Sequence, residues 1–435
     1  MGGGTLVRFS WVGLFSMVVA FLGGEASAQV TGRIVGPGAT RLEIAVSPLA
    51  DGGGAKEAGA RFAEVLSRNL KLSGYFSVLD PKAYLEGPTP VDPAQINFAN
   101  WTVIGAKALV KGTVSQSGGS LAVEVRLYDV GQHMQIGGER YTGSPELVPR
   151  MARRFADKIM EYLTGELGPF DSRIAFASRR GGRAKEILVM SVDGYDVMTV
   201  TNNRTINLAP SWSPDAGSIL FTSFMDGNAS LYRADVPPRS VQKLSSSHGL
   251  NLGGRWSPDG KWIAISLERG GNSDLFLLDG SGRVQRQLTN GAEIDVSPTW
   301  SPDGRQIAFV SSRTGTPQVY VMGADGSSPR RITFQGGYNT SPCWSPKGDL
   351  IAYVGREQGF NVFTLNLKTN QVRQITSGGN NEDPSFSPDG RYLVFSSTRV
   401  GKPALFLADT TGEHQVQLTT SGGDDTSPSW SPRLP

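Results

Sequence analysis

Residues 298–304 read PTWSPDG, and the W-S-P at the centre of this stretch returns along the chain with a fixed period. The aromatic residue stands at Trp212, Trp256, Trp300, Trp344, Phe386 and Trp430, at intervals of 44, 44, 44, 42 and 44 residues. A constant period in this range is typical of repeat proteins. Four short strands and their turns fill about 44 residues, which is one propeller blade. The sequence therefore predicts an all-β six-bladed β-propeller over residues 169–435.

The turn after each tryptophan explains how one unit folds. In S-P-D-G, proline fixes one φ angle, serine and aspartate bond to the turn backbone, and glycine accepts the left-handed conformation. Apolar runs such as Ile307 to Val310 then predict strands that are buried on both faces. The repeated carboxylates could suggest catalysis, but Lys347 and Arg433 replace aspartate without breaking the pattern. We interpret Asp215, Asp259, Asp303 and Asp389 as turn residues.

The two ends of the repeat region are incomplete in complementary ways. The segment Arg173 to Asn202 has three strand signals with no W-S-P before it, and Trp430 to Pro435 has W-S-P with no strands after it. Joined, they make one blade. We therefore expect the C-terminal strand to pair with the strand at Arg173 to Ala177 and to close the ring, which removes exposed sheet edges.

Residues 29–165 have a different pattern and predict a mixed α/β N-terminal domain. Strands are expected at Ile44 to Pro48 and Phe76 to Leu79, with a small sheet from Trp101 to Val114, Leu121 to Tyr128 and about Gln135 to Tyr141. Glu57 to Leu72 has helical spacing at Phe62, Val65, Leu66 and Leu70. Ser144 and Pro145 predict the start of a second helix, which runs to about Leu163 before Gly165.

The first 28 residues predict a secretory signal peptide. An apolar run from Phe9 to Leu22 precedes GGEASA, and cleavage is expected between Ala28 and Gln29. A membrane anchor is the alternative, but the apolar run is short for a span of about 20 residues. No later stretch predicts membrane insertion. Gly36-Pro37-Gly38 leaves residues 29–41 without a structural pattern, so we expect a mobile N-terminal arm.

Composition limits the chemistry that the chain can perform. The net charge is +3 and no basic run contains interleaved aromatic residues, which excludes a typical nucleic-acid binder. Cys343 is the one cysteine, and it occupies a repeated slot that elsewhere holds Ser211, Thr299, Ser385 and Ser429, so it is expected to be a small packing residue. The sequence has no G-x-S-x-G elbow, no Walker A motif and no H-E-x-x-H motif. We predict no enzyme activity, no metal and no cofactor.

Loops between the repeated strands offer a docking surface. In a blade, the loop between the second and third strands lies on the same face as the loop that leads to the next blade. The first set of loops is basic, and the second is polar or acidic. Many loops of both signs that converge on one channel mouth favour a folded protein as the partner. The candidate contact residues are His248, Asn251, Glu293, Asp295, Asn339, Asp383 and Asp424.

This combination of parts resembles the TolB family of exported propeller proteins. The resemblance rests on the signal peptide, the α/β domain, the junction TGELGPFDSRIAFAS at Thr164 to Ser178, and six repeats that end in P-S-W-S-P. It implies a non-enzymatic adaptor in the periplasm, within the Tol–Pal system that supports outer-membrane invagination and envelope integrity. It also implies that the channel face binds the peptidoglycan-associated lipoprotein Pal, through loops Ser247 to Gly253 and Gly291 to Ser297.

The resemblance implies a second partner, the inner-membrane-anchored protein TolA, bound by the N-terminal arm. Family N-termini are more hydrophobic and more β-like than QVTGRIVGPGA, and only the segment of Arg33, Ile34 and Val35 resembles them here. The sequence also allows a function of a different kind. An exported propeller enzyme or binding protein could act on an envelope polysaccharide through the channel.

Overall fold

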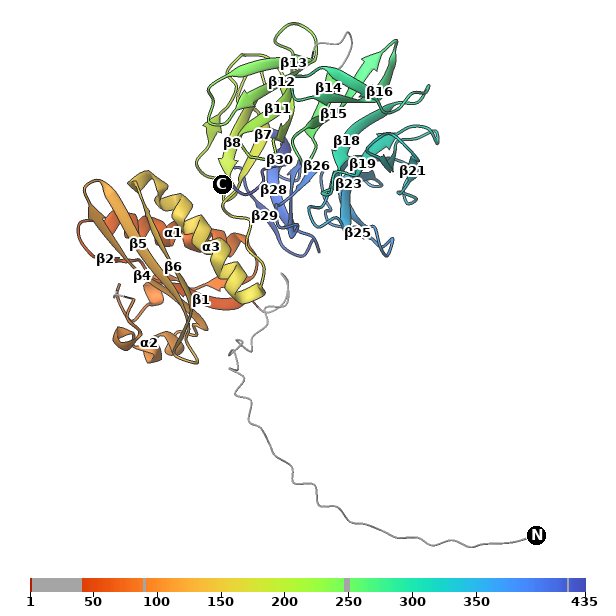
Figure 1. Ribbon diagram of the computed structural model, residues 1–435. Coiled ribbons are helices and arrows are strands. Elements are labelled where there is room, and N and C mark those ends of the chain that lie inside the picture. The colour runs from red at the N-terminus through yellow and green to blue at the C-terminus, as the bar shows by residue number, and fades with distance from the viewer. Residues whose placement is uncertain (2–40, 89–90, 246–250, 421) are drawn as a thin grey trace. The chain divides into compact units, whose positions relative to one another are not determined.

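The computed structural model describes Met1 and residues 41–88, 91–245, 251–420 and 422–435. Within this part of the chain, an N-terminal α/β domain is followed by a six-bladed β-propeller, as predicted (Figure 1). Several predictions fall outside the described residues and stay predictions. They are the signal peptide with its Ala28–Gln29 cleavage site, the N-terminal arm with Arg33, Ile34 and Val35, and His248 in the propeller.

The N-terminal domain has one mixed sheet with strand order β3-β1-β4-β5-β6, and β2 pairs with β4. Strand β1 runs parallel to both β3 and β4, whereas β4, β5 and β6 form an antiparallel meander. The strands are Leu42–Val46 (β1), Ala50–Asp51 (β2), Phe76–Val78 (β3), Ala108–Ser117 (β4), Ser120–Asp129 (β5) and Met134–Gly143 (β6). The helices are Lys56–Leu72 (α1), Phe98–Val103 (α2) and Val148–Thr164 (α3), with 3-10 turns at Pro81–Ala83 (η1), Pro93–Gln95 (η2) and Pro145–Leu147 (η3).

The two long helices bury the apolar faces that their periodicity predicts. In α1, all four residues with helical spacing are completely buried: Phe62, Val65, Leu66 and Leu70. In α3, Phe155 is equally buried, and its ring centroid lies 6.4 Å from that of Phe62. Burial of a large apolar side chain stabilises a fold by about 1.5–3 kcal/mol, so these faces hold the helices together and against the sheet.

Two details of the N-terminal prediction were wrong. Trp101 lies in helix α2 rather than in a strand, because Phe98 and Trp101 are three residues apart and bury one helical face. Helix α3 begins at Val148, one turn later than Ser144 suggested, because the Pro145–Leu147 turn is a 3-10 helix. Its predicted end is confirmed, since Gly165 adopts φ 81° and its N–H donates to the Glu161 carbonyl at 2.8 Å.

Each propeller blade is a four-stranded antiparallel sheet, and the blades follow one another around the ring in chain order. The first blade is β30 (Asp424–Trp430), β7 (Arg173–Arg179), β8 (Glu186–Ser191) and β9 (Met198–Thr199). The second is β10 (Asn207–Trp212), β11 (Ser218–Ser223), β12 (Ser230–Asp235) and β13 (Val241–Ser245). The third is β14 (Asn251–Trp256), β15 (Trp262–Arg269), β16 (Asn272–Asp279) and β17 (Val284–Gln287).

The remaining three blades repeat this arrangement. The fourth is β18 (Asp295–Trp300), β19 (Gln306–Ser311), β20 (Gln318–Gly323) and β21 (Arg330–Arg331). The fifth is β22 (Asn339–Trp344), β23 (Leu350–Arg356), β24 (Phe360–Asn366) and β25 (Val372–Gln374). The sixth is β26 (Asn381–Phe386), β27 (Tyr392–Ser397), β28 (Ala404–Asp409) and β29 (Gln415–Gln417).

The S-P-D-G segment forms the hairpin between the first two strands of a blade. In the fourth blade, Ser301 Oγ donates to Asp303 Oδ1 at 2.6 Å and accepts from the Gln306 N–H at 2.9 Å. Gly304 adopts φ 70° and donates to the Ser301 carbonyl at 2.9 Å. The same serine-to-aspartate bond occurs at Asp215, Asp259 and Asp389. The repeated aspartates therefore act as turn residues.

The predicted ring closure is confirmed. Strand β30 pairs antiparallel with β7 and is the innermost strand of the first blade, with Thr426 opposite Ala177 and Trp430 opposite Ile174. Figure 1 shows the blue C-terminal strand beside the yellow-green β7. One blade is thus built from both ends of the repeat region, and the ring keeps no unpaired edge at the junction.

Candidate functional site: the propeller channel

The innermost strand of every blade carries a β-bulge that lines the central channel. The bulged residue lies three positions before the tryptophan or phenylalanine and has a positive φ in all six blades. The six residues are Ala209 (φ 50°), Gly253 (67°), Ser297 (56°), Ser341 (49°), Asp383 (54°) and Ser427 (51°). A non-glycine residue in this region carries local strain, so the ring holds five such residues in a conformation that only the surrounding sheet enforces.

The channel contains a cavity of about 670 Å³ whose walls are partly apolar and partly polar. Its walls include the prolines that follow the bulges in five blades and the indole rings of the repeat. The prolines are Pro210, Pro298, Pro342, Pro384 and Pro428. A cavity of this volume falls within the range of small-molecule sites, and its polar side chains could orient a ligand.

Three charged residues line the cavity: Arg255, Asp383 and Arg433. Arg433 lies at the end near the α/β domain junction, where its guanidinium donates to the carbonyls of Gly168 at 3.0 Å and Leu167 at 2.9 Å. Arg255 takes the slot before Trp256 and donates from Nη1 to the Pro210 carbonyl at 3.3 Å. Burial lowers the pKa of Arg255, and the nearby Asp383 carboxylate partly opposes that shift.

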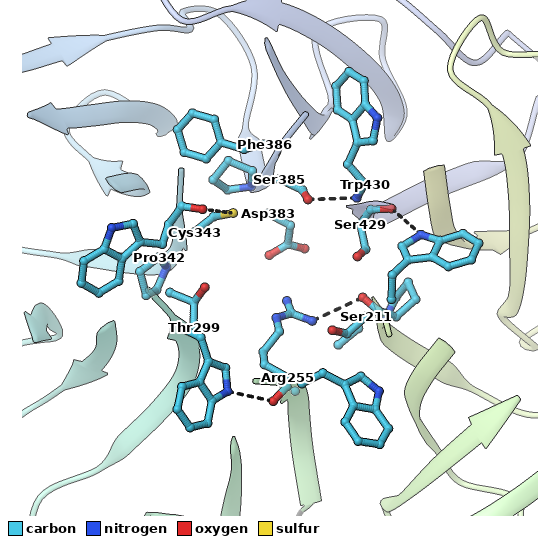
Figure 2. Close-up of a pocket in the computed structure, with 18 of the residues that line it drawn as sticks. Ser211, Arg255, Thr299, Pro342, Cys343, Asp383, Ser385, Phe386, Ser429 and Trp430 are labelled. Carbon is cyan, nitrogen blue, oxygen red and sulfur yellow. Dashed lines mark hydrogen bonds between the residues drawn. The ribbon is translucent and has the colours of Figure 1, made fainter. Parts of the chain in front are cut away.

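Asp383 bridges the bulges of the two blades beside its own. Its carboxylate accepts from Ser427 Oγ at 2.9 Å and from Ser341 Oγ at 3.3 Å. Asp383 belongs to the sixth blade and Arg255 to the third, so they stand on opposite sides of the ring. Figure 2 shows both side chains pointing into the middle of the cavity, toward each other. Among the described residues, no ion pair within 4.0 Å joins them.

Cys343 occupies the same slot as Arg255, two blades along. Its Sγ lies 4.0 Å from the Trp344 carbonyl oxygen, and burial raises the pKa of the thiol. Cys343 is half-buried, and a thiol with a raised pKa stays protonated and is a poor nucleophile. This supports the interpretation of Cys343 as a small packing residue. In the described ranges, no cluster of three or more His, Cys, Asp or Glu side chains could hold a metal ion.

Three of the predicted contact residues are buried and bond within the fold. Asn251, Asp295 and Asn339 are at most 2% exposed, because each starts the innermost strand of its blade and points into the sheet. Asn339 Nδ2 donates to the Gln335 carbonyl and to Gln318 Oε1, both at 2.8 Å, and Asp295 pairs with Arg313 at 3.1 Å. Direct contact with a partner is therefore not available to these three side chains.

These three belong to a set of six buried polar residues, one in each blade, that the sequence prediction missed. Every blade has an asparagine or aspartate five positions before its tryptophan or phenylalanine, and all six are buried: Asn207, Asn251, Asp295, Asn339, Asn381 and Asp425. In the first blade, Asp425 accepts from Ser178 Oγ at 2.6 Å. The constant offset from the aromatic residue is the signal that could have identified them, because a position that repeats in every blade serves the blade.

The other described contact residues remain accessible. Glu293 and Asp424 are half-buried at the loop ends of their blades, and Asp383 lines the cavity. Asp424 forms an ion pair with Arg179 across the closure of the ring. The structure thus brings Asp383 to the channel wall and leaves Glu293 and Asp424 on the surrounding loops.

In the part of the chain that the structure describes, no helix combines the length and the hydropathy needed to cross a membrane.

Comparisons with known proteins match both domains. The TolB amino-terminal domain family matches residues 31–136, and the TolB β-propeller domain family matches residues 160–434. The crystal structure of TolB from Acinetobacter baumannii superposes with a TM-score of 0.81 at 27% sequence identity, covering 90% of this chain and 97% of that one.

Curated relatives agree over shorter segments. A protein named "Tol-Pal system protein TolB" from Desulfosudis oleivorans is 41% identical over 172 residues, which is 39% of each chain. The protein of the same name from Cereibacter sphaeroides is 37% identical over 218 residues, 49% of this chain and 48% of the relative. The chain thus spans about half or less of the length of these relatives. Because the propeller family alone covers more than half of the chain, the chain belongs to the TolB family.

Proposed function

We propose that this chain is a non-enzymatic adaptor of the Tol–Pal system, located in the periplasm. It binds the lipoprotein Pal through the channel face of the propeller and TolA through the N-terminal arm. In this role it supports outer-membrane invagination during division and the integrity of the envelope. Membership of the TolB family is the observation that carries the proposal, since the relatives are named as Tol–Pal system proteins.

The channel face has the properties of a preformed docking surface. The six buried Asn and Asp residues fix the point where each connecting loop enters its blade. Asn251 Nδ2, for example, donates to the Ala229 carbonyl at 2.7 Å. A surface that is fixed before binding loses little conformational freedom when a partner binds. Strand starts that are fixed in this way, among the described residues, support docking of a folded protein with little rearrangement.

The charges of this face fit a protein partner better than a polyanion. Asp424 is paired with Arg179, and Arg313 with the buried Asp295, so acidic and basic groups lie beside each other at these two places. Interleaved charges of both signs give orientation and specificity to a complex rather than general attraction to one sign. Glu293, which forms no ion pair with another described residue, is one of the side chains that we assign to Pal contact.

A titration of purified Pal into the full chain tests this assignment. We expect the double variant His248→Ala, Glu293→Ala to bind Pal at least tenfold more weakly, since a central contact can contribute 2 kcal/mol or more. Its melting temperature should equal that of the parent. The matched control is Lys261→Ala, Arg305→Ala, which changes two exposed residues in S-P-D-G hairpins on the opposite face.

Each outcome of this titration decides something. Equal dissociation constants for the parent and the double variant would reject this face as the Pal site. Failure of the parent itself to bind Pal, together with release of a carbohydrate product from isolated envelopes, would instead support the alternative of a propeller that acts on an envelope polysaccharide.

A further inference from the structure

The channel wall holds two side chains of opposite charge, Arg255 and Asp383, on opposite sides of the ring. Arg255 and Asp383 face each other across a partly apolar cavity of about 670 Å³, and no ion pair within 4.0 Å joins them in the described structure (Figure 2). Placing a charge in an apolar environment is costly unless a partner compensates it. Two charges kept apart in one cavity therefore call for a ligand that meets both.

The arginine is not needed to build the blade. The corresponding slots of the other five blades hold Ser211, Thr299, Cys343, Ser385 and Ser429, which form the same strand and the same bulge. A guanidinium carries five N–H donors in a planar fork, and only one contact, that of Nη1 with the Pro210 carbonyl, is made to the described protein. The remaining donors face the cavity and match the geometry of a carboxylate.

The aspartate is equally specific to one blade. The other bulge positions hold Ala209, Gly253, Ser297, Ser341 and Ser427, none of which is charged. Hydroxyl groups of Ser427 and Ser341 hold the Asp383 carboxylate in place from both sides. A carboxylate has about four lone-pair sites, so it retains capacity for a donor that enters from the cavity. An ammonium group supplies such donors together with the complementary charge.

These two groups restrict the class of ligand. A simple anion would be attracted by Arg255 but repelled by Asp383. A simple cation would be attracted by Asp383 but repelled by Arg255. Because proline and tryptophan rings make up much of the wall between them, the body of the ligand must be compact and partly apolar. We infer that the channel binds a zwitterionic amino acid or short peptide, with its carboxylate on Arg255 and its ammonium group on Asp383.

This binding goes beyond the proposed adaptor function and does not depend on it. Pal and TolA are absent from the experiment, so failure of one proposal leaves the other standing. A terminus of a long protein chain would offer only one of the two charges at the site, whereas a free amino acid or a short peptide offers both on one small molecule. Capped peptides separate these cases directly.

The test is a fluorescence titration of the full chain, because the indoles in the channel wall report occupancy. The probes are alanyl-alanine, N-acetyl-alanyl-alanine and alanyl-alanine amide. The variants are Arg255→Ser and Asp383→Ser, which copy residues from other blades, and Arg305→Ser is a control outside the cavity. Melting curves check that each variant is folded.

We expect saturable binding of alanyl-alanine and at least about tenfold weaker binding of both capped peptides, as is usual when a charge-assisted hydrogen bond is lost. In Arg255→Ser, the free peptide and the amide should bind equally, and in Asp383→Ser, the free and acetylated peptides should bind equally. Arg305→Ser should match the parent. The inference is overturned if alanyl-alanine gives no saturable signal, if capping has no effect, or if neither channel variant changes the preference.

Discussion

The indole Nε1 of Trp300 donates a hydrogen bond of 3.1 Å to the backbone carbonyl of Arg255, which belongs to the neighbouring blade. Trp212 forms the same bond with the Ser429 carbonyl, also at 3.1 Å. The repeated tryptophan thus links each of these blades to the one before it. Trp256 differs, since its buried Nε1 has no hydrogen-bond partner among the described residues.

This difference predicts unequal costs for the same substitution. Trp300→Phe should lower the free energy of unfolding by about 1 kcal/mol more than Trp256→Phe, because only the first removes a made hydrogen bond and leaves a carbonyl without its partner. Phe386 already occupies the equivalent slot of the sixth blade, so a phenylalanine fits. Urea unfolding of both variants measures the difference, and equal losses would show that the indole bond does not link the blades.

Deletion of residues Thr426 to Pro435 should abolish the cooperative unfolding of the propeller. The deletion removes most of β30, so β7 loses its innermost partner and the ring opens. Calorimetry and near-ultraviolet circular dichroism measure this change, with deletion of Pro435 alone as the control. An unchanged, cooperative melting transition in the longer deletion would be incompatible with closure by β30.

Gly253→Ala should destabilise the propeller by about 1 kcal/mol. Gly253 has φ 67°, a conformation that costs an L-residue about 1–2 kcal/mol, yet no described atom lies within 4 Å of the Cβ that alanine would add. The cost would thus come from the backbone alone. Gly280→Ala is the control, since its φ is not positive and its new Cβ meets only Trp256 at 3.8 Å. Chemical denaturation should rank the two variants in this order, and a neutral Gly253→Ala would mean that the bulge carries no strain.

Asp157 predicts a dependence of stability on pH. Burial raises its pKa from 3.8 to about 7, although the N–H groups of Phe170 and Asp171 bond to the carboxylate at 2.6 and 2.9 Å and oppose the shift. The folded state therefore holds this proton more tightly than the unfolded state. The contribution of Asp157 to the free energy of unfolding is therefore fully present below about pH 4, and it is lost as the pH rises through 7.

Comparison of the parent with Asp157→Asn isolates this group. Between pH 5 and pH 7, the parent should lose about 2 kcal/mol from Asp157 that the variant does not lose, at about 1.4 kcal/mol for each pH unit. Urea unfolding at both pH values gives the two differences. Parallel pH profiles for the parent and the variant would place the pKa of Asp157 near its usual value.

Removal of Gln29 to Ala39 should abolish capture of the C-terminal domain of TolA while Pal binding survives. An extended segment can add a strand to the edge of a partner's sheet, where backbone hydrogen bonds supply the affinity. Arg33 and Ile34 would then fix the register and provide an apolar anchor. Pull-down with both partners tests this, with the triple substitution of Arg33, Ile34 and Val35 by glycine as a second variant. Undiminished TolA capture by the truncated chain would rule out the arm as the site.

The fold was largely predictable because the same turn signal recurs in every repeat, so the assignment does not depend on any single segment. One W-S-P-D-G turn is a weak signal, but six at a nearly constant spacing leave one architecture, and the unmatched ends identify the closing strand. Trp101 had no such support. A short run of aromatic and β-branched residues fits a strand or one buried helical turn equally well, and only the contacts of Phe98 and Trp101 select the helix.

The candidate site was less predictable for a geometric reason. Loop position suggested that Asn251 and Asn339 are exposed, but a polar residue at a strand start can point into the sheet and bond there. Sequence alone also gave no sign that Arg255 and Asp383 face each other. They lie in different repeats, and only closure of the six-bladed ring places the third blade opposite the sixth.

The shared first blade also sets an order of events during synthesis. Strand β7 is made before every other strand of the propeller, yet its inner neighbour β30 is made after all of them. A growing chain can therefore stack five blades in succession while the first remains incomplete, as an open arc with two free edges. The last step joins segments from opposite ends of the repeat region, which is the slow kind of contact in folding. The cell that makes this protein must therefore protect the two free edges of the open arc until the ring closes. Formation of any single blade is the smaller demand.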